Sequence, residues 1–190
     1  MNNNNKKIKS TKFNKKFNKI MIVAHPDDEL IFGGAEIIQN KGYKVVCMTN
    51  QDNKKRLKEF TGLMKELKVA YEILDHKDDS RVKNIDDEYI NYIEKLLKNK
   101  NINKIVTHNK KGEYGHNFHK AVSTIVTDIC KNNDLLDKLY YFHTGETKID
   151  EKLIKRKLEL MEKHYPSQYK VLVNLNLNKS IENETLKKFK

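Results

Sequence analysis

Two short segments carry side chains that could hold a metal ion and move a proton. The first, AHPDDEL at residues 24–30, places a histidine, a proline and three consecutive acids directly after an apolar run. The second, THNKKGEYGHNFH at residues 107–119, contains three histidines, so the two segments together hold four of the chain's seven histidines. Imidazole and carboxylate groups are common zinc ligands in catalytic sites, so this concentration predicts a metal site.

The spacing within the first segment predicts that its two adjacent aspartates point in different directions. Pro26 suits the first position of a helix, because its fixed φ fits there and its missing N–H loses nothing. His25 and Asp28 are three residues apart and can turn toward one point, whereas Asp27 must point elsewhere. Two adjacent ionised carboxylates repel one another unless a cation lies near them. Taken alone, this acidic turn favours helix capping over catalysis.

The second segment repeats this spacing with two imidazoles. His116 and His119 are also three residues apart, so one ring could bind a metal while the other faces a substrate. His25, Asp28 and His119 would then supply two nitrogens and one carboxylate, the ligand count of a catalytic zinc site with an open position for water. Such an ion lowers the pKa of water from ~15.7 toward ~7, so the Asp27 carboxylate would suffice as a general base. Fe²⁺ or Co²⁺ could occupy the same site.

The elements around these segments follow the pattern of an α/β fold. Strand-like apolar runs alternate with amphipathic helical stretches, which predicts a single Rossmann-like domain with a mostly parallel sheet and helices on both faces. The predicted strands are residues 19–24, 43–49, 69–75, 103–109, 138–144 and, at an edge, 169–177. The predicted helices are residues 28–40, 54–67, 87–97, 117–130 and 150–164. Both histidine-rich segments follow strands, and such sheets bind ligands beyond the carboxyl ends of their strands.

The two segments resemble the signature segments of the PIG-L/LmbE-like zinc deacetylases, which remove acetyl groups from N-acetylglucosamine-containing substrates. The resemblance includes the Gly33-Gly34 pair in AHPDDELIFGG and the Tyr-Gly-His-x-x-His spacing at residues 114–119. Weaker similarity extends through RLKEF, LDHKDD and HYPSQ and so spans most of residues 19–170. The resemblance therefore implies a zinc-dependent amidohydrolase that acts on an N-acetylated sugar, either free or as a glycoconjugate.

The resemblance also implies a role for each matched position at the reacting group. His25, Asp28 and His119 would bind zinc. Asp27 would be the general base. His116 would stabilise the tetrahedral oxyanion or protonate the leaving amine.

Three further positions would contact the substrate in this scheme. Tyr114 would assist at the carbonyl oxygen. Arg56 and Asp78 fall where members of the family contact sugar hydroxyls. The sugar itself, the group that carries it and the oligomeric state are not determined by the sequence.

The net charge of +12 is concentrated at the N-terminus. Residues 1–19 hold seven lysines and no acid, which leaves 12 − 7 = +5 for residues 20–190. Low complexity and few large apolar groups predict a disordered basic tail at residues 1–18. Residues 19–178 would form the deacetylase domain, and residues 179–190 a C-terminal tail or short helix. The tail could contact nucleic acid or an acidic membrane surface weakly, so a basic binding protein with a vestigial metal pocket is one alternative.

A metal-dependent phosphoesterase and a structural metal site are two further alternatives. A single carboxylate ligand argues against a two-metal phosphoesterase, and structural zinc usually has four protein ligands, commonly including cysteine. Cys47 and Cys130 lie far apart in apolar segments, which favours reduced thiols and a cytoplasmic location, with peripheral attachment to a membrane as a variant. No run approaches the roughly 18–20 apolar residues of a transmembrane helix.

Overall fold

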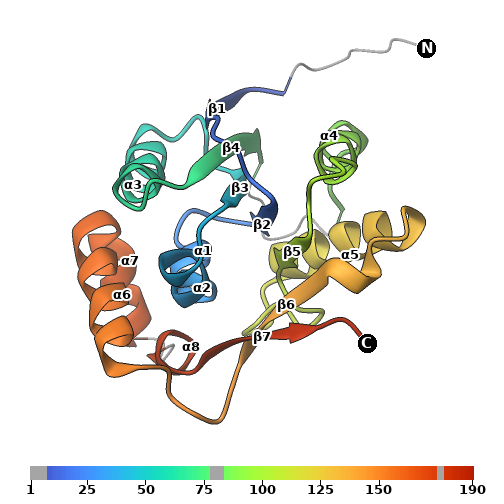
Figure 1. The fold of residues 1–190 in the computed structure, drawn as a ribbon. Helices are drawn as coiled ribbons and strands as arrows, with labels where there is room; N and C mark the ends of the chain where they lie inside the picture. Colours follow the sequence, from blue (N-terminus) through green and yellow to red (C-terminus); the bar gives the residue numbers. More distant parts are fainter. Residues whose placement is uncertain (1–7, 78–83, 175–177) are drawn as a thin grey trace.

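A seven-stranded β-sheet forms the centre of the computed structural model, which describes residues 8–77, 84–174 and 178–190. The strand order is β1-β4-β3-β2-β5-β6-β7 (Figure 1). Neighbouring strands from β4 to β6 pair in parallel, and β1 and β7 pair antiparallel at the two edges. The strands are β1 Ser10–Phe13, β2 Lys19–Val23, β3 Tyr43–Thr49, β4 Ala70–His76, β5 Lys104–Thr107, β6 Leu139–Thr144 and β7 Glu184–Lys188. The predicted Rossmann-like, mostly parallel sheet is confirmed.

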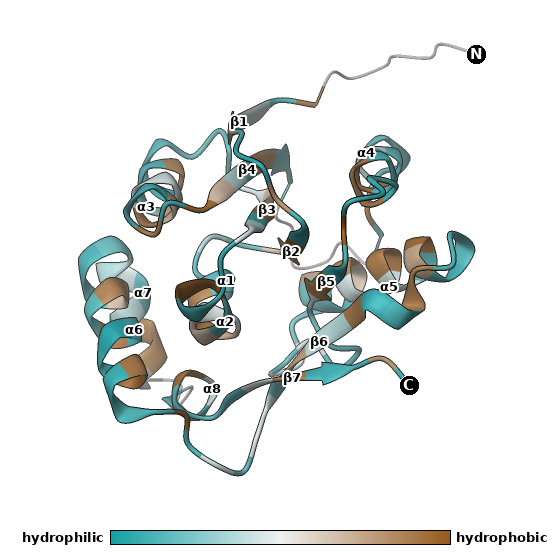
Figure 2. Ribbon diagram, viewed as in Figure 1, coloured by the Kyte–Doolittle hydropathy of each residue, from teal (hydrophilic) through white to brown (hydrophobic). Residues whose placement is uncertain are grey.

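Helices cover both faces of this sheet, as expected. Helices α4 and α5 pack on one face, and the remaining α-helices gather on the other (Figure 1). The helices are α1 Asp28–Ile31, α2 Gly34–Gln39, α3 Lys54–Glu66, α4 Asp87–Leu97, α5 Asn117–Asn132, α6 Glu151–His164, α7 Pro166–Asn174 and α8 Asn178–Glu182, with a short 3₁₀ turn at Leu136–Lys138. In Figure 2 the hydrophobic residues of α4 and α6 lie on the sides that face the sheet. No helix among the described residues combines the length and apolar character needed to cross a bilayer.

Strand β2 is buried on both faces, which fixes the loop that follows it. Met21 and Val23 belong to one core cluster, whereas Ile20 and Ile22 belong to the other, and all four are fully buried. An apolar run without alternation is what a central parallel strand requires, because helices cover both of its faces. The loop at His25 therefore begins from a rigid position in the sheet.

The predicted helix at residues 28–40 is divided into α1 and α2, which are separated at Phe32 and Gly33. The division brings the backbone close to its neighbours. A Cβ atom on Gly33 would lie 2.5 Å from Cε of Met21 in β2, and one on Gly34 would lie 2.8 Å from Cε of Lys157 in α6. The glycine pair allows this close approach. Apolar residues continue through the break between α1 and α2, so the hydrophobic periodicity of the sequence does not reveal that break.

The predicted edge strand at residues 169–177 is wrong. Residues 166–174 form helix α7, and residues 175–177 lie outside the described residues. Pro166 is the first helical residue, a position that its fixed φ favours. Tyr165, Tyr169 and Leu172 are spaced by four and three residues and contact the same core cluster. A short apolar run such as YKVLV fits a strand or a helix equally well, and packing against this cluster decides for the helix.

Both edges of the sheet come from segments that were predicted to lie outside the domain. Ser10–Phe13, placed in a disordered tail by its composition, forms β1 along β4, with Ser10 opposite Leu74. Residues 184–188, predicted as tail or short helix, form β7 along β6, and a short helix is present only in α8. Edge pairing uses backbone groups, so a polar sequence can still supply an edge strand. The other part of the predicted tail, residues 1–7, lies outside the described residues.

A buried ion pair ties the C-terminal strand to helix α2. The Lys157 ammonium is fully buried and contacts the Glu184 carboxylate. The same Nζ donates to the carbonyl oxygens of Ile31 and Ile181, each at 3.1 Å. Glu184 also accepts the backbone N–H of Ala35 at 2.8 Å, in the first turn of α2. The pair therefore holds β7, α6 and α2 together below the first histidine-rich loop.

Removing the positive member of this pair is predicted to destabilise the fold. Lys157→Met should lower the free energy of unfolding by ~3–5 kcal/mol, because it leaves the buried Glu184 carboxylate without a cation. Denaturant unfolding measures the change, and the double variant Lys157→Met/Glu184→Gln should recover part of the loss. A single variant within ~0.5 kcal/mol of the wild type would contradict the assigned contribution of the pair.

Candidate metal centre

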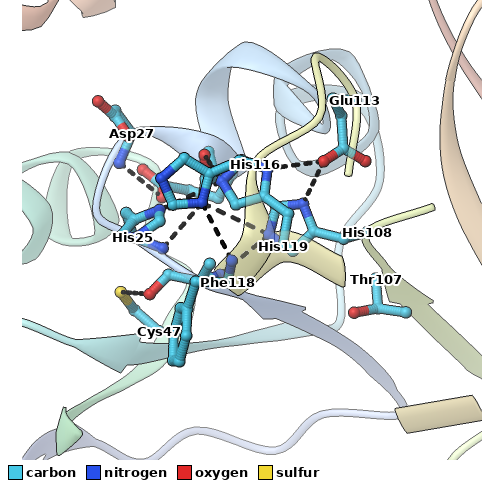
Figure 3. Close-up of polar contacts among 12 residues, drawn as sticks. His25, Asp27, Cys47, Thr107, His108, Glu113, His116, Phe118 and His119 are labelled. Atoms are coloured by element: carbon cyan, nitrogen blue, oxygen red, sulfur yellow. Dashed lines mark hydrogen bonds and ion pairs between the residues drawn. The ribbon is translucent and has the colours of Figure 1, made fainter. Parts of the chain in front are cut away.

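The two histidine-rich segments meet beyond the carboxyl ends of β2 and β5. These strands are parallel neighbours, with Ile22 opposite Thr107. The order of the strands reverses here, because β3 and β4 lie on one side of β2 and β6 lies beyond β5. Open α/β sheets bind ligands at such a reversal. Figure 3 shows the loop after β2 and the start of α5 bringing their side chains together.

The three predicted metal ligands bring their ligand atoms close together. Nδ1 of His25 lies 3.2 Å from Nε2 of His119 and 3.3 Å from Oδ2 of Asp28. Nε2 of His119 lies 3.3 Å from Oδ1 of Asp28. Ligand atoms that each lie ~2.0–2.1 Å from a tetrahedral zinc ion are separated by about 3.3 Å from one another. The three side chains therefore have separations close to those of ligands of one divalent ion, with Asp28 presenting Oδ2 to His25 and Oδ1 to His119.

The electrostatics of Asp28 suit a ligand that stays ionised. Asp28 is 3% exposed and His119 is fully buried. Oδ2 of Asp28 accepts the backbone N–H of His25 at 2.8 Å. Burial raises the pKa of Asp28, but His119, His108 and His25 together lower it by more than burial raises it, so that the pKa lies well below its usual value. The carboxylate is therefore charged at neutral pH.

Glu113, which the sequence did not single out, orients one of the predicted ligands. Its Oε2 accepts a hydrogen bond from Nδ1–H of His119 at 2.7 Å, so that Nε2, on the side of Asp28, is the atom of the neutral ring that could bind a metal. Its Oε1 accepts the backbone N–H of Asn109 at 2.9 Å. Burial raises the pKa of Glu113, but the histidines beside it lower the pKa to about 2. Glu113 is thus a charged acceptor that fixes the tautomer of the predicted ligand.

His108 is a second residue that was not assigned from the sequence. Its ring is stacked on that of His119, with centroids 4.0 Å apart. Nδ1–H donates to Oε2 of Glu113 at 2.8 Å, and Nε2 accepts the backbone N–H of Ala24 at 3.0 Å. Figure 3 shows both rings turned toward the Glu113 carboxylate. The sequence does place His108 and Glu113 in one segment, at residues 107–119. Their contacts depend on the path of that loop, which residue types do not encode.

Asp27 lies beside the predicted ligands and points in another direction, as its position in the turn requires. Its φ of 108° is rarely adopted by residues other than glycine. Oδ2 of Asp27 lies 3.2 Å from Nη2 of Arg56, which also donates to the carbonyl oxygen of Pro26. Burial and the neighbouring Asp28 raise the pKa of Asp27 to about 7, although Arg56 and His25 lower it. Strained backbone of this kind is frequent at functional sites.

Arg56, predicted to contact sugar hydroxyls, is held by acidic groups of the protein. Besides Asp27 it contacts Glu59, with Nη1 2.8 Å from Oε2. Its guanidinium also lies 5.5 Å from the centroid of the Tyr165 ring. The structure therefore shows Arg56 supporting the turn that carries Asp27. Asp78, the other predicted sugar contact, lies outside the described residues.

His116 and Tyr114 lie near the opening of the site. Nδ1 of His116 accepts the backbone N–H of Phe118 at 3.3 Å, so Nε2 is the ring atom that can carry a proton. The His116 ring lies 4.8 Å from the His25 ring, and ligand atoms of His25, His116 and His119 lie within 4.8 Å of one another. Tyr114 is 51% exposed, and its ring lies 5.8 Å from that of His116.

A cavity of about 320 Å³ opens over these groups. His25, Asp27 and Asp28 line it together with Arg56 and with residues from other elements, namely Ile31, Phe32, Asn50, Asn53, Tyr114, His116, Gln168, Val171 and Leu172. Three of these residues belong to α7, the segment predicted as an edge strand. Helix α7 is thus a wall of the site that the sequence did not reveal.

Known proteins show the same fold. The structure of Dbv21, the deacetylase of an antimicrobial pseudoaglycone, matches with a TM-score of 0.63 and 17% identity over 85% of this chain and 86% of that chain. A triple mutant of a deacetylase from the teicoplanin biosynthetic pathway matches with a TM-score of 0.63 and 13% identity over 85% of this chain and 88% of that chain. At these identities the likeness concerns the fold alone.

Sequence comparison identifies the family. An uncharacterised protein of Acanthamoeba polyphaga mimivirus is 37% identical over 174 residues, which cover 83% of this chain and 74% of that protein. The family model described as PIG-L, GlcNAc-PI de-N-acetylase, matches residues 20–130, a range that contains both histidine-rich segments. This match covers more than half of the chain and confirms the resemblance found in the sequence. The protein belongs to the PIG-L family of de-N-acetylases.

Proposed function

We propose that the protein is a metal-dependent hydrolase that removes the acetyl group from an N-acetylated sugar of the N-acetylglucosamine type, free or conjugated. The observation that supports it most directly is the clustering of the His25, Asp28 and His119 ligand atoms, with neighbouring pairs 3.2–3.3 Å apart. His25 and Asp28 also line a cavity together with Asp27. Three protein ligands on one side of an open cavity are typical of catalytic zinc sites. Family membership supports an N-acetyl amide as the bond to be cleaved.

The predicted ligands suit Zn²⁺, with Fe²⁺ or Co²⁺ as alternatives, because two imidazoles and one carboxylate are acceptable to each of these ions. When bound, the ion would act as a Lewis acid that polarises the amide and makes water easier to deprotonate. Glu113 would keep Nε2 of His119 available by accepting the proton on Nδ1. Buried Asp28 would supply the negative charge that the cation needs.

The proton transfers would be carried out by residues on either side of the three predicted ligands. Asp27 would accept a proton from the attacking water, with Arg56 fixing its orientation. His116 would donate a proton from Nε2 to the leaving amine, since its Nδ1 accepts the Phe118 amide. Tyr114, at the opening of the cavity, would donate to the carbonyl oxygen as negative charge develops on it. Acetate and the free sugar amine would be the products.

Sugar recognition by Arg56 and Asp78 stays a proposal carried by the family resemblance. Arg56 does line the cavity. Its Nη atoms are already engaged with Asp27, Pro26 and Glu59. We therefore expect its replacement to affect the general base as well as the affinity for the sugar.

Metal dependence and reaction type can be tested together. Full-length protein is expected to purify with about one equivalent of a divalent ion and to release acetate from at least one member of a panel of N-acetylated sugars and their conjugates. Chelation should abolish acetate release, and added Zn²⁺ should restore it. Unchanged acetate release after complete removal of the metal would exclude the proposed metal role. A panel without any acetate release would exclude the proposed reaction.

The role of Asp27 is tested by Asp27→Asn. The variant should retain its metal but lose ~10²-fold or more in kcat, because the amide cannot accept the proton of water. Asparagine has nearly the same shape and tolerates positive φ, so the strained turn should be preserved. Metal analysis and kcat are measured on the same preparation. Turnover equal to that of the wild type would reject Asp27 as the base.

The role of Glu113 is tested by Glu113→Gln. Loss of the charged acceptor should weaken metal binding by ~10–100-fold, because the His119 ring is no longer fixed in orientation and tautomer. Competition with a chromophoric chelator measures the affinity. Glu162→Gln, an exposed substitution in α6 with the same change in charge, is the control and should bind metal as the wild type does. Equal affinities for both variants would remove Glu113 from this role.

A further inference from the structure

The turn that carries Asp27 has a backbone conformation that its neighbours must maintain. The φ of Asp27 is 108°, a value that is costly for a residue with a Cβ atom and persists only where surrounding contacts enforce it. On the carbonyl side of Asp27, its oxygen accepts the N–H groups of Leu30 and Ile31 at 3.0 and 2.9 Å, which fixes the start of α1. The peptide group that precedes Asp27 must be fixed by other contacts.

Two side chains hold this preceding peptide group, one at each end. Arg56 donates through Nη2 to the carbonyl oxygen of Pro26. Glu29 accepts the backbone N–H of Asp27 on Oε2 at 3.1 Å. A peptide unit is planar and rigid, so engaging both its C=O and its N–H prevents it from rotating. The two contacts therefore fix φ of Asp27.

Glu29 is itself held by a residue from a distant part of the chain. Its side chain is fully buried, and a buried carboxyl group is costly unless its oxygens have hydrogen-bond partners. Oε1 of Glu29 accepts the O–H of Tyr165 at 2.6 Å. Tyr165 lies 136 residues farther along the chain, between α6 and α7, and is also fully buried. Its hydroxyl thus helps to fix the rotamer of Glu29 and the oxygen that faces the Asp27 amide.

Tyr165 also contacts the second side chain that holds this peptide group. The Arg56 guanidinium lies 5.5 Å from the centroid of the Tyr165 ring, within the range of a cation–π interaction. Burial and the neighbouring Glu29 raise the pKa of the Tyr165 hydroxyl well above its usual value, so it keeps its proton and stays a donor. One buried tyrosine at the α6–α7 junction therefore meets both groups that fix the turn.

We propose that Tyr165 is a positioning residue for the general base. Through Glu29 and Arg56 it holds the peptide group before Asp27 and so sets the direction in which the Asp27 carboxylate points. Tyr165 is not among the described residues that line the cavity over the metal centre, so it would act through these two side chains rather than on the substrate. This inference rests on the proposed deacetylation for the role of Asp27, and it adds that the catalytic turn depends on the α6–α7 junction.

Hydrogen exchange at the Asp27 amide tests this contact without requiring turnover. In isotope-labelled full-length protein, the amide should exchange at least about 10-fold faster in Tyr165→Phe than in the wild type, because Glu29 is no longer held against it. Phenylalanine retains the ring and therefore the packing beside Arg56. NMR measures both rates well below the unfolding midpoints. Equal rates, or an Asp27 amide that is unprotected in the wild type, would overturn the inference.

Tyr92→Phe is the matched control for general loss of stability. Tyr92 in α4 also donates its hydroxyl to a buried carboxylate, that of Glu72, but α4 packs on the other face of the sheet. Both variants lose a hydrogen bond of the same kind, so their thermal unfolding midpoints should fall by similar amounts. Exchange at Asp27 and kcat should stay as in the wild type in Tyr92→Phe. An equal acceleration of exchange in both variants would overturn the positioning role.

Kinetics then connect the contact to the general base. Tyr165→Phe should lower kcat at least about 10-fold, because a displaced base loses its alignment with the attacking water, and should leave KM and bound metal unchanged. In the Asp27→Asn background the same substitution should have no further effect, since the group that it positions is gone. Additive losses of kcat in the double variant would overturn the inference. If the wild type releases no acetate from any substrate, the proposed function fails, and exchange at Asp27 still decides whether Tyr165 holds the turn.

Discussion

The position of one buried carboxylate, Asp28, between the imidazoles of His25 and His119 is the constraint on which the rest of the structure depends. A charge this deeply buried is costly unless it is paired and hydrogen-bonded. Asp28 meets that requirement through the backbone amide of His25 and through two rings, one from the loop after β2 and the other from the first turn of α5. The loops meet because β2 and β5 are parallel neighbours, so their carboxyl ends share an edge of the sheet. The pairing of β2 with β5 therefore sets the geometry of the site.

Successive layers of charge hold this arrangement. Glu113 fixes His119 from behind, and Arg56 holds Asp27 from the side. Farther from the cavity, the Lys157–Glu184 pair ties α2 to the last strand of the sheet. Each of these buried charges has a partner of opposite sign or a set of hydrogen bonds, which is how a polar centre persists in an apolar core.

Predictions from the sequence succeed where they depend on residues close together in the chain, and they fail where they depend on contacts between distant segments. His25 and Asp28, like His116 and His119, are separated by three residues, and local spacing of this kind is visible in the chain itself. The continuous apolar run of β2 likewise indicates a central parallel strand. By contrast, YKVLV fits a strand as well as a helix, and its packing beside Tyr165 is what produces α7. Ser10–Phe13 becomes a strand only because β4 offers an unpaired edge.

The sequence by itself determined the α/β alternation, the candidate ligands within each histidine-rich segment and the family to which the chain belongs, since each is set by residue type and short spacing. Only the tertiary structure decided that Glu113 and His108 support His119, that Arg56 holds Asp27, and that α7 closes the cavity. Those contacts join residues whose meeting depends on how loops and strands pack. Distances between such side chains are fixed by the folded core and leave no periodic trace in the order of amino acids.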